Sequence, residues 1–380
     1  MSRVFVAGAK RSAVIPRGGA FKHLQADEIA APVIDAVLKE AGLPKDAVQQ
    51  VIMGNALYAG GNPARLAALR AGLPEHIPAI TIDTQCCSGM DALHHGAALI
   101  KSGMASAVVV GGMESYSRSP IRMKRPLADE APAAYDRPAF TPWADRDPDM
   151  LVSAAGLSQS ENVTREMQEV YAAQSHQNAL SAAKSEQPEI VTIEGQCKDA
   201  FTRKMSPRFL GRLTSICGQL PYDLTAATVA VEADAAAALL LIGEEIAEKV
   251  PAVLAEYISS ISLGTDPEKP ALSPLAAIEA LLQQSGKQKT DVDVFEVMEA
   301  FALQGVLTQR YLGPDLFSRL NRSGGALARG HPIGASGAIN LVRLTSELIK
   351  ADLGALGIAA IAAAGGLGSA ALFAKSESRN

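Results

Sequence analysis

The sequence has few aromatic side chains, few cysteines and no long apolar run. Aromatic residues make up only 4% of the 380 residues, against 48% hydrophobic residues in all, so aliphatic and small side chains must build the core. No uninterrupted apolar stretch approaches the roughly 20 residues of a membrane-spanning helix, so we expect no such helix. The four cysteines lack metal-ligand spacing, so we expect no metal site and a reducing compartment.

The sequence also lacks an excess of positive charge. Its formal net charge is −5, which argues against nucleic acid as the main partner. The first ten residues read M-S-R-V-F-V-A-G-A-K and run directly into a strand pattern, without the apolar core and cleavage site of a secretory signal. We therefore expect a cytoplasmic protein that binds neither nucleic acid nor membrane.

Short apolar runs alternate with longer amphipathic segments in both halves of the chain. This alternation predicts an α/β protein with mostly parallel sheets and helices on both faces. The same rhythm in both halves suggests an internal duplication. Strands are expected at 4–8, 48–55, 79–83, 107–111, 251–259, 292–298, 357–363 and 370–375, and helices at 26–41, 63–71, 88–101, 273–284, 303–310 and 334–349.

Residues 118–233 break this alternation. The segment begins with proline and charge, including the basic run at 122–126, and later contains a helical pattern at 164–184. Because structureless loops of this length are rare in compact domains, we expect an inserted loop or lid domain. The first half would then span 1–117, completed by about 234–250, and the second half 251–380. The basic run could meet the phosphates of a nucleotide, although a solvated charged face is the simpler interpretation.

The segment from Asn321 to Gly337 is dense in glycine and holds His331 between Gly330 and Pro332. Glycines allow close approach of a bulky group, and the proline stiffens the turn that carries the imidazole. The pattern N-x-x-G-G-A-x-A-x-G-H-P-x-G-A-S-G resembles the histidine loop of thiolases, which make or cleave the carbon–carbon bond of 3-ketoacyl-CoA. Similar matches extend over nearly the whole chain, at 7–19, 62–65, 111–115 and 164–177.

The first catalytic motif of that family, C-x-S-G, reads here Cys86-Cys87-Ser88-Gly89. The resemblance assigns the nucleophile to Cys86 and leaves Cys87 a structural role. A position at the start of a helix suits this chemistry, because the helix N-terminus favours a thiolate and supplies N–H groups for an oxyanion. By the same resemblance, His331 activates Cys86 and donates to a thioester oxygen. No bound cofactor is implied, and coenzyme A is expected as substrate or product.

Three places depart from the family pattern. The N-E-A-F-A motif reads Met298-Glu299-Ala300-Phe301-Ala302, so a thioether replaces an amide that holds a catalytic water. The C-x-G motif reads Ala362-Ala363-Ala364, so alanine replaces the acid/base cysteine at Ala362, while Ala364 keeps the backbone N–H of an oxyanion hole. We therefore expect the condensing step to be impaired, and with Met298 facing the site we expect a somewhat more apolar pocket.

The third departure lies in the stretch that lines the pantetheine channel in the family. Alanine and valine stand there at the positions of its serine and glycine, and Val231 would narrow the channel. The resemblance predicts that acyl-CoA is bound by Met150, Ala230, Val231, Gly330 and Gly365.

The resemblance implies the thiolase fold, five αβαβα layers made by two duplicated halves with an inserted loop domain, assembled as a homodimer or homotetramer. Three functions stay open. The chain is an acetyl-CoA C-acyltransferase that forms an acyl-enzyme on Cys86, an enzyme that passes the acyl group to water or a non-CoA acceptor, or a degenerate CoA-binding or partner subunit. The retained Cys86 and His331 suffice for the acyl-enzyme.

Overall fold

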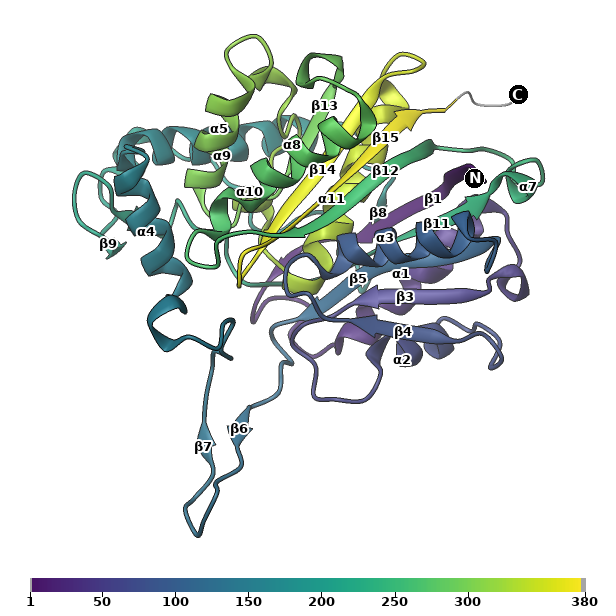
Figure 1. Cartoon of the computed structure of the whole chain (residues 1–380), viewed down its shortest axis with the longest axis horizontal. Coiled ribbons are helices and arrows are strands. Elements are labelled where there is room, and N and C mark those ends of the chain that lie inside the picture. Colours follow the sequence, from purple (N-terminus) through teal and green to yellow (C-terminus); the bar gives the residue numbers. More distant parts are fainter. Residues whose placement is uncertain (1, 377–380) are drawn as a thin grey trace.

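The computed structural model describes residues 2–376 and is built around one mixed sheet of 11 strands (Figure 1). The strand order is β13-β14-β15-β12-β1-β11-β5-β3-β4, with β2 beside β11 and β8 beside β1. The strands are β1 (Val4–Ser12), β2 (Ile15–Pro16), β3 (Gln50–Gly54), β4 (Ala79–Ile82), β5 (Ala107–Ser115), β8 (Ile190–Val191), β11 (Ala233–Gly243), β12 (Ala255–Gly264), β13 (Val294–Val297), β14 (Leu356–Ala363) and β15 (Leu367–Lys375).

Helices pack in three layers around these strands. In the described part of the chain the longer helices are α1 (Ala26–Ala41), α2 (Pro63–Arg70), α3 (Ser88–Lys101), α4 (Met150–Ser160), α5 (Arg165–Ala182), α8 (Ser273–Ser285), α9 (Ala302–Leu312) and α11 (Ile333–Lys350). Helices α1 and α2 cover the outer face of the first half, and α8 covers that of the second. Helices α3 and α11 lie between the two halves and contact strands of both. The strands of the first half and those of the second half lie on opposite sides of α3 and α11, so they count as two layers. With the three helical layers the arrangement has five layers.

Small residues allow the central layer to form. A Cβ placed on Gly89 of α3 would lie 2.8 Å from the backbone nitrogen of Ala338 on α11. A Cβ placed on Gly337 of α11 would lie 2.7 Å from the nitrogen of Met90. Contacts this short exclude any side chain, so α3 and α11 touch backbone to backbone. The glycine- and alanine-rich composition thus explains the tight packing at the centre.

The sheet differs from the expected one in two respects. Strand β11 was not predicted, and it pairs antiparallel with both β1 and β5. Strand β15 likewise pairs antiparallel with β12 and β14, so parallel pairs are confined to β1–β8, β3–β4, β3–β5 and β13–β14 in the described chain. The expectation of mostly parallel sheets is therefore wrong. Pairing of β1 with β12 also joins the halves into one ladder.

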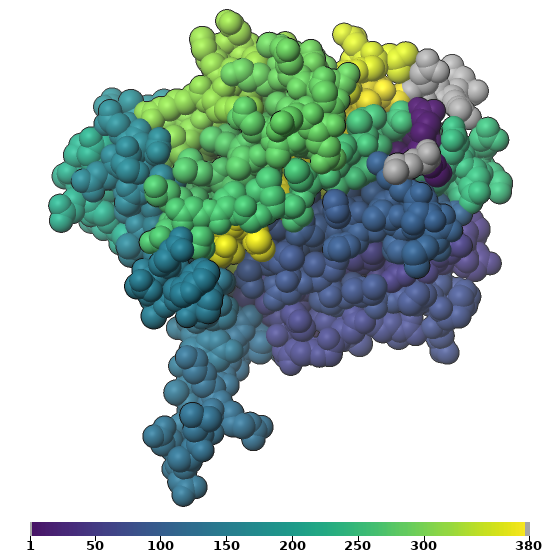
Figure 2. Space-filling model, viewed as in Figure 1, coloured from purple at the N-terminus to yellow at the C-terminus, as the bar shows by residue number. Residues whose placement is uncertain are grey.

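The chain between β5 and β11 forms the irregular part of the molecule. It contains the short hairpin β6 (Met123–Lys124) and β7 (Ala133–Ala134), the helices α4 and α5, the one-turn helix α6 (Pro207–Leu210), and the strands β9 (Ser215–Cys217) and β10 (Leu224–Thr225). Helix α5 matches the expected helix, whereas α4 was not predicted. The hairpin projects away from the body (Figure 2). Among the described residues, no helix is long and apolar enough to cross a membrane.

Candidate active site

Cys86 lies in the turn between β4 and α3, where local hydrogen bonds hold the backbone. Gln85 adopts a left-handed conformation with φ of 55°, which is uncommon for a residue with a side chain. Ser88 stabilises this turn, because its hydroxyl donates to the Gln85 carbonyl at 2.5 Å and accepts from the Thr84 N–H at 2.9 Å. The turn presents Cys86 two residues before the first residue of α3, as the motif predicted.

His331 lies directly against Cys86. Its Nε2 is 3.2 Å from the Cys86 Sγ, and its Nδ1 is 2.7 Å from the Ser336 hydroxyl. That hydroxyl donates its proton to the Pro332 carbonyl at 3.1 Å, so it must accept a proton from His331 Nδ1. Nε2 is then unprotonated and accepts from the thiol. The backbone therefore selects the imidazole tautomer that can take a proton from Cys86.

Burial favours the neutral forms of both groups. Burial lowers the pKa of His331 to about 4 and raises the pKa of Cys86 to about 12. The backbone N–H groups of Ala364 and Cys86 oppose the second shift, since they donate toward the sulfur. At neutral pH the resting pair is a thiol and a neutral imidazole. The thiolate forms only as the proton moves to Nε2.

The N–H groups of Ala364 and Cys86 also form a candidate oxyanion hole. They belong to two separate elements, the turn after β14 and the turn before α3. The first turn reverses the chain into β15 through Gly365 and Gly366, with φ values of 81° and 79° that favour glycine. The tight turn therefore keeps the backbone N–H of Ala364 directed toward the Cys86 sulfur, although alanine replaces the glycine of the family motif at this position.

Glu114, at the end of β5, holds the start of α11 in place through a hydrogen bond from its backbone. It is fully buried, and its carboxylate accepts from the Asn55 amide at 2.6 Å and from the N–H groups of Ala56, Leu57 and Gly334 at 3.0, 3.2 and 2.9 Å. Burial raises the pKa of Glu114 to about 7, although the backbone N–H donors oppose this rise. The carboxylate links residues 55–57 to the histidine loop.

A cavity of about 440 Å³ opens onto Cys86 and His331. Of the residues predicted to bind acyl-CoA, Met150 and Ala230 line it, as do Ala362 and Ala364 from the altered second motif. Apolar side chains from all three parts of the chain form much of the remaining wall: Leu57, Pro138, Phe140, Leu151, Ala154, Val229, Pro270, Ala271, Ala300, Phe301 and Ile333. The site therefore lies where the first half, the second half and the inserted segment meet.

Three predicted binding residues do not line this cavity. Val231 instead contributes its carbonyl, which accepts from the His331 N–H at 2.7 Å, and it supports the histidine loop. Gly330 precedes His331 with φ of 121°, and a Cβ there would lie 2.8 Å from that of Ala233. Gly365 forms the tight turn under Phe140. These residues shape the site through the backbone, and their direct contact with a ligand stays a prediction.

Met298 is also placed differently from the expectation that it faces the site. Its side chain is 2% exposed and belongs to the core between the two halves. It borders a small void of about 10 Å³ together with Ser336 and Asn340, behind the catalytic histidine. Strand β13 ends at Val297, so Val297 and Met298 point to opposite faces, and Met298 points inward. It therefore cannot make the cavity itself more apolar.

Sequence reasoning missed several polar residues of the cavity. Tyr116, directly after β5, and Gln304 line it, as does Arg122, which the basic run offered only as a contact for nucleotide phosphates. Gln304 orders the wall, because its Oε1 accepts from the N–H groups of Ala300 and Phe301 at 2.8 and 3.2 Å. Tyr116 could have been found as the residue following a strand end, the usual place for site residues in α/β sheets.

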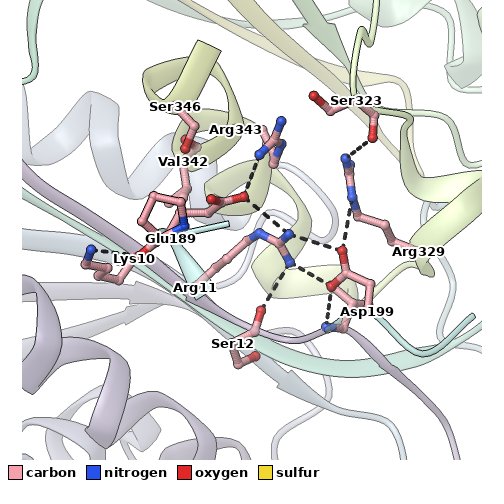
Figure 3. A network of polar contacts seen from close by, with 12 residues as sticks. Lys10, Arg11, Ser12, Glu189, Asp199, Ser323, Arg329, Val342, Arg343 and Ser346 are labelled. Atoms are coloured by element: carbon pink, nitrogen blue, oxygen red, sulfur yellow. Dashed lines mark hydrogen bonds and ion pairs between the residues drawn. The ribbon is translucent and has the colours of Figure 1, made fainter. Parts of the chain in front are cut away.

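A buried network of charges fixes the histidine loop to the rest of the molecule (Figure 3). Arg329, two residues before His331, lies 3.3 Å from Asp199 of the inserted segment and donates to the Ser323 carbonyl at 2.7 Å. Arg11 of β1 donates to the same Asp199 at 2.7 Å. Burial alone would raise the pKa of Asp199, but Arg11 and Arg329 bring it below its ordinary value. Asp199 therefore stays charged and couples the inserted segment to the catalytic loop.

Family models match both parts of the chain. The thiolase N-terminal domain matches residues 4–245 and the thiolase C-terminal domain matches residues 251–375. The chain belongs to the thiolase family. Neither model delimits the inserted segment at 118–233, so those boundaries stay predictions.

Relatives of this thiolase agree with the assignment. A Bacillus subtilis (strain 168) protein is 35% identical over 97% of this chain and 98% of its own. A Staphylococcus aureus (strain MRSA252) protein is 32% identical over 99% and 100%. Both bear the name "Putative acetyl-CoA C-acetyltransferase", as YhfS and VraB. The predicted enzyme class, an acyltransferase of the thiolase family, is thereby confirmed.

Solved structures confirm the predicted fold. Human mitochondrial 3-ketoacyl-CoA thiolase in complex with CoA is 28% identical with a TM-score of 0.90, covering 99% of this chain and 98% of the human one. Acat5 thiolase from Ascaris suum in complex with coenzyme A has the same identity and TM-score, covering 98% and 100%. The α/β thiolase fold is thus shared over nearly the whole chain.

Proposed function

We propose that this thiolase takes an acyl group from an acyl-CoA or 3-ketoacyl-CoA onto Cys86 and passes it to a second substrate. The observation that supports this most directly is the 3.2 Å contact between Cys86 Sγ and His331 Nε2 at the cavity. Two similar thiolase structures contain coenzyme A, which supports CoA as the carrier of the acyl group. Coenzyme A would then be a substrate or product, with no other cofactor bound.

With an acyl-CoA donor the first half-reaction needs only groups that the site contains, whereas a 3-ketoacyl-CoA donor would leave a carbanion whose protonation needs the acid that Ala362 lacks. His331 Nε2 accepts the Cys86 proton while the sulfur attacks the thioester carbonyl, and the carbonyl oxygen becomes an anion facing the N–H groups of Cys86 and Ala364. As the intermediate collapses, the bond to the CoA sulfur breaks and His331 returns the proton to that sulfur. The products are acyl-Cys86 and free CoA. Ser336 keeps the imidazole in the required tautomer throughout.

The second half-reaction distinguishes possible acceptors. An acceptor with an S–H or O–H group can give its proton to His331 as it attacks acyl-Cys86. A carbon acceptor must lose a proton from carbon, and Ala362 offers no acid/base group where the family has cysteine. We therefore propose that condensation is impaired and that thiol or water acceptors are favoured. Transfer to water or to a non-CoA acceptor is the second candidate function, supported by this alanine.

A catalytically inert subunit is the third candidate, and the geometry disfavours it. An inert site has no reason to keep the thiol, the oriented imidazole and both N–H groups at a cavity. We also propose a homodimer or homotetramer located in the cytoplasm. The exposed Ile80 on the edge strand β4 supports association along that edge.

The test is to incubate the protein with a panel of acyl-CoAs and measure its intact mass. We expect one acyl adduct, absent in Cys86→Ala and unchanged in Cys197→Ala, because Cys197 is exposed and outside the cavity. Free CoA and ketoacyl product are then quantified to identify the acceptor. A folded protein that forms no adduct and releases no CoA with any donor would refute the proposal and favour the inert subunit.

A further inference from the structure

Arg122 brings a guanidinium without a carboxylate partner into the catalytic cavity. Its Nη2 donates to the Ala56 carbonyl at 3.1 Å, and Arg122 lines the cavity together with Cys86. Among the described residues, no ion pair of 4.0 Å or less involves Arg122. A guanidinium offers five N–H donors, so most of its donors remain available to a ligand.

The other charged side chains that line the cavity are either held in ion pairs or negatively charged. Arg137 is held by the Asp147 carboxylate at 2.7 Å, and Glu232 is held by Arg17 at 2.8 Å. Asp136 lines the same cavity without an ion pair of 4.0 Å or less to Arg122 in the described structure. Arg122 is therefore the cavity-lining cation that an incoming anion can meet without displacing a carboxylate.

Hydrogen bonds also link the wall at Arg122 to the start of α11. Its partner Ala56 donates its own N–H to Glu114, and the same carboxylate oxygen accepts from Gly334. Gly334 follows Ile333, which lines the cavity and stands two residues after His331. Short contacts thus connect the Arg122 guanidinium to the wall beside the catalytic pair.

We propose that Arg122 determines specificity for acyl-CoA donors whose acyl chain ends in a carboxylate. The proposal rests on acyl-enzyme formation at Cys86 and names the class of acyl group. A guanidinium binds a carboxylate through charge-assisted hydrogen bonds, often two in parallel. A largely apolar cavity strengthens that interaction because water competes less for the donors. Arg122 touches the far end of the acyl chain and takes no part in proton transfer.

The test compares two donors of equal chain length, glutaryl-CoA and pentanoyl-CoA. For each, kcat/KM for acylation of Cys86 is measured by intact mass in the wild type and in Arg122→Gln. We expect the wild type to prefer glutaryl-CoA and the variant to lose about 10- to 100-fold of that preference, the range for a hydrogen bond to a charged group. Acylation by pentanoyl-CoA should fall much less than acylation by glutaryl-CoA, and a melting temperature equal to that of the wild type would show that the variant is folded.

The matched control is Arg125→Gln, on the exposed hairpin three residues away and outside the cavity lining. It should leave both donors unaffected. An equal loss for both donors in Arg122→Gln would overturn the proposal and place Arg122 on the CoA portion common to them. Unchanged selectivity would also overturn it. If neither donor acylates wild-type Cys86 while the protein is folded, the acyl-enzyme proposal itself fails.

Discussion

Restoring a thiol at position 362 should restore condensing and thiolytic chemistry. Ala362 lines the cavity with Cys86 and His331, and its side chain is 8% exposed. Its backbone is fixed by the pairing of β14 with β15, where Ala362 faces Gly368. An added sulfur would therefore point from a rigid strand end toward the reacting atoms.

The size of the gain follows from the role of the missing group. General acid–base catalysis by a placed side chain typically contributes about 10²- to 10⁴-fold, or about 3 to 5.5 kcal/mol of activation free energy. We expect Ala362→Cys to reach the lower end, about 100-fold. Met298 explains this limit, because it leaves a second departure from the family motif unrepaired behind His331.

The assay follows CoA-dependent cleavage of acetoacetyl-CoA by loss of its enolate absorbance. Ala362→Ser is the matched control, since a hydroxyl of similar size stays protonated and should give no gain. Acylation of Cys86 is measured in parallel and should be the same in all three proteins. The reasoning is refuted if Ala362→Cys cleaves no faster than wild type while it acylates normally and melts at the same temperature.

Three further outcomes follow from the structure. His331→Gln should slow acylation by at least about 100-fold. Because the pKa of His331 is lowered to about 4, the acylation rate of the wild type should stay constant between about pH 7 and about pH 5 and fall only near pH 4. A fall of the rate centred near pH 6.5 would contradict the buried neutral imidazole. Asp199→Asn should lower the free energy of unfolding in urea by about 3–5 kcal/mol, because Arg329 is left as a buried charge with one partner fewer; a loss below about 1 kcal/mol would contradict it. Ile80→Asp should reduce the size measured by light scattering if β4 is an assembly edge, and an unchanged size would exclude that edge.

The helices were the most predictable part of the fold. Helix α1 has the expected bounds and ends at Gly42, whose φ of 61° suits a glycine cap, and α3 also has the expected bounds. Strand β11 was missed because its alanine-rich first half has neither alternation nor β-branched residues. It needs neither, since it lies between two helical layers and is buried on both faces. The residues around it, not its own pattern, make this segment a strand.

The proximity of Cys86 and His331 was predictable through the family resemblance, because each belongs to a matching motif at a helix start; their catalytic roles stay predictions. The orientation of Met298 was not, since alternate positions along a strand point to opposite faces and the sequence does not say which face borders the cavity. Arg122 was also not predictable as a site residue. Its run of basic residues resembles a solvated surface, and only the path of the chain brings one of them to Ala56.

The separation of the site into independent elements explains how one half-reaction can persist without the other. Cys86 and His331 precede α3 and α11, which contact each other through Gly89 and Gly337 at distances that tolerate no side chain. Position 362 belongs to a different element, the end of β14. A substitution there removes a proton carrier without disturbing the helix contact that aligns thiol and imidazole. General decay of function would spare neither element, so an intact pair beside an altered strand end supports the proposed acylation step. The ratio of Cys86 acylation to ketoacyl-CoA cleavage is then the quantity that would distinguish an acylating thiolase from a condensing one and from an inert one.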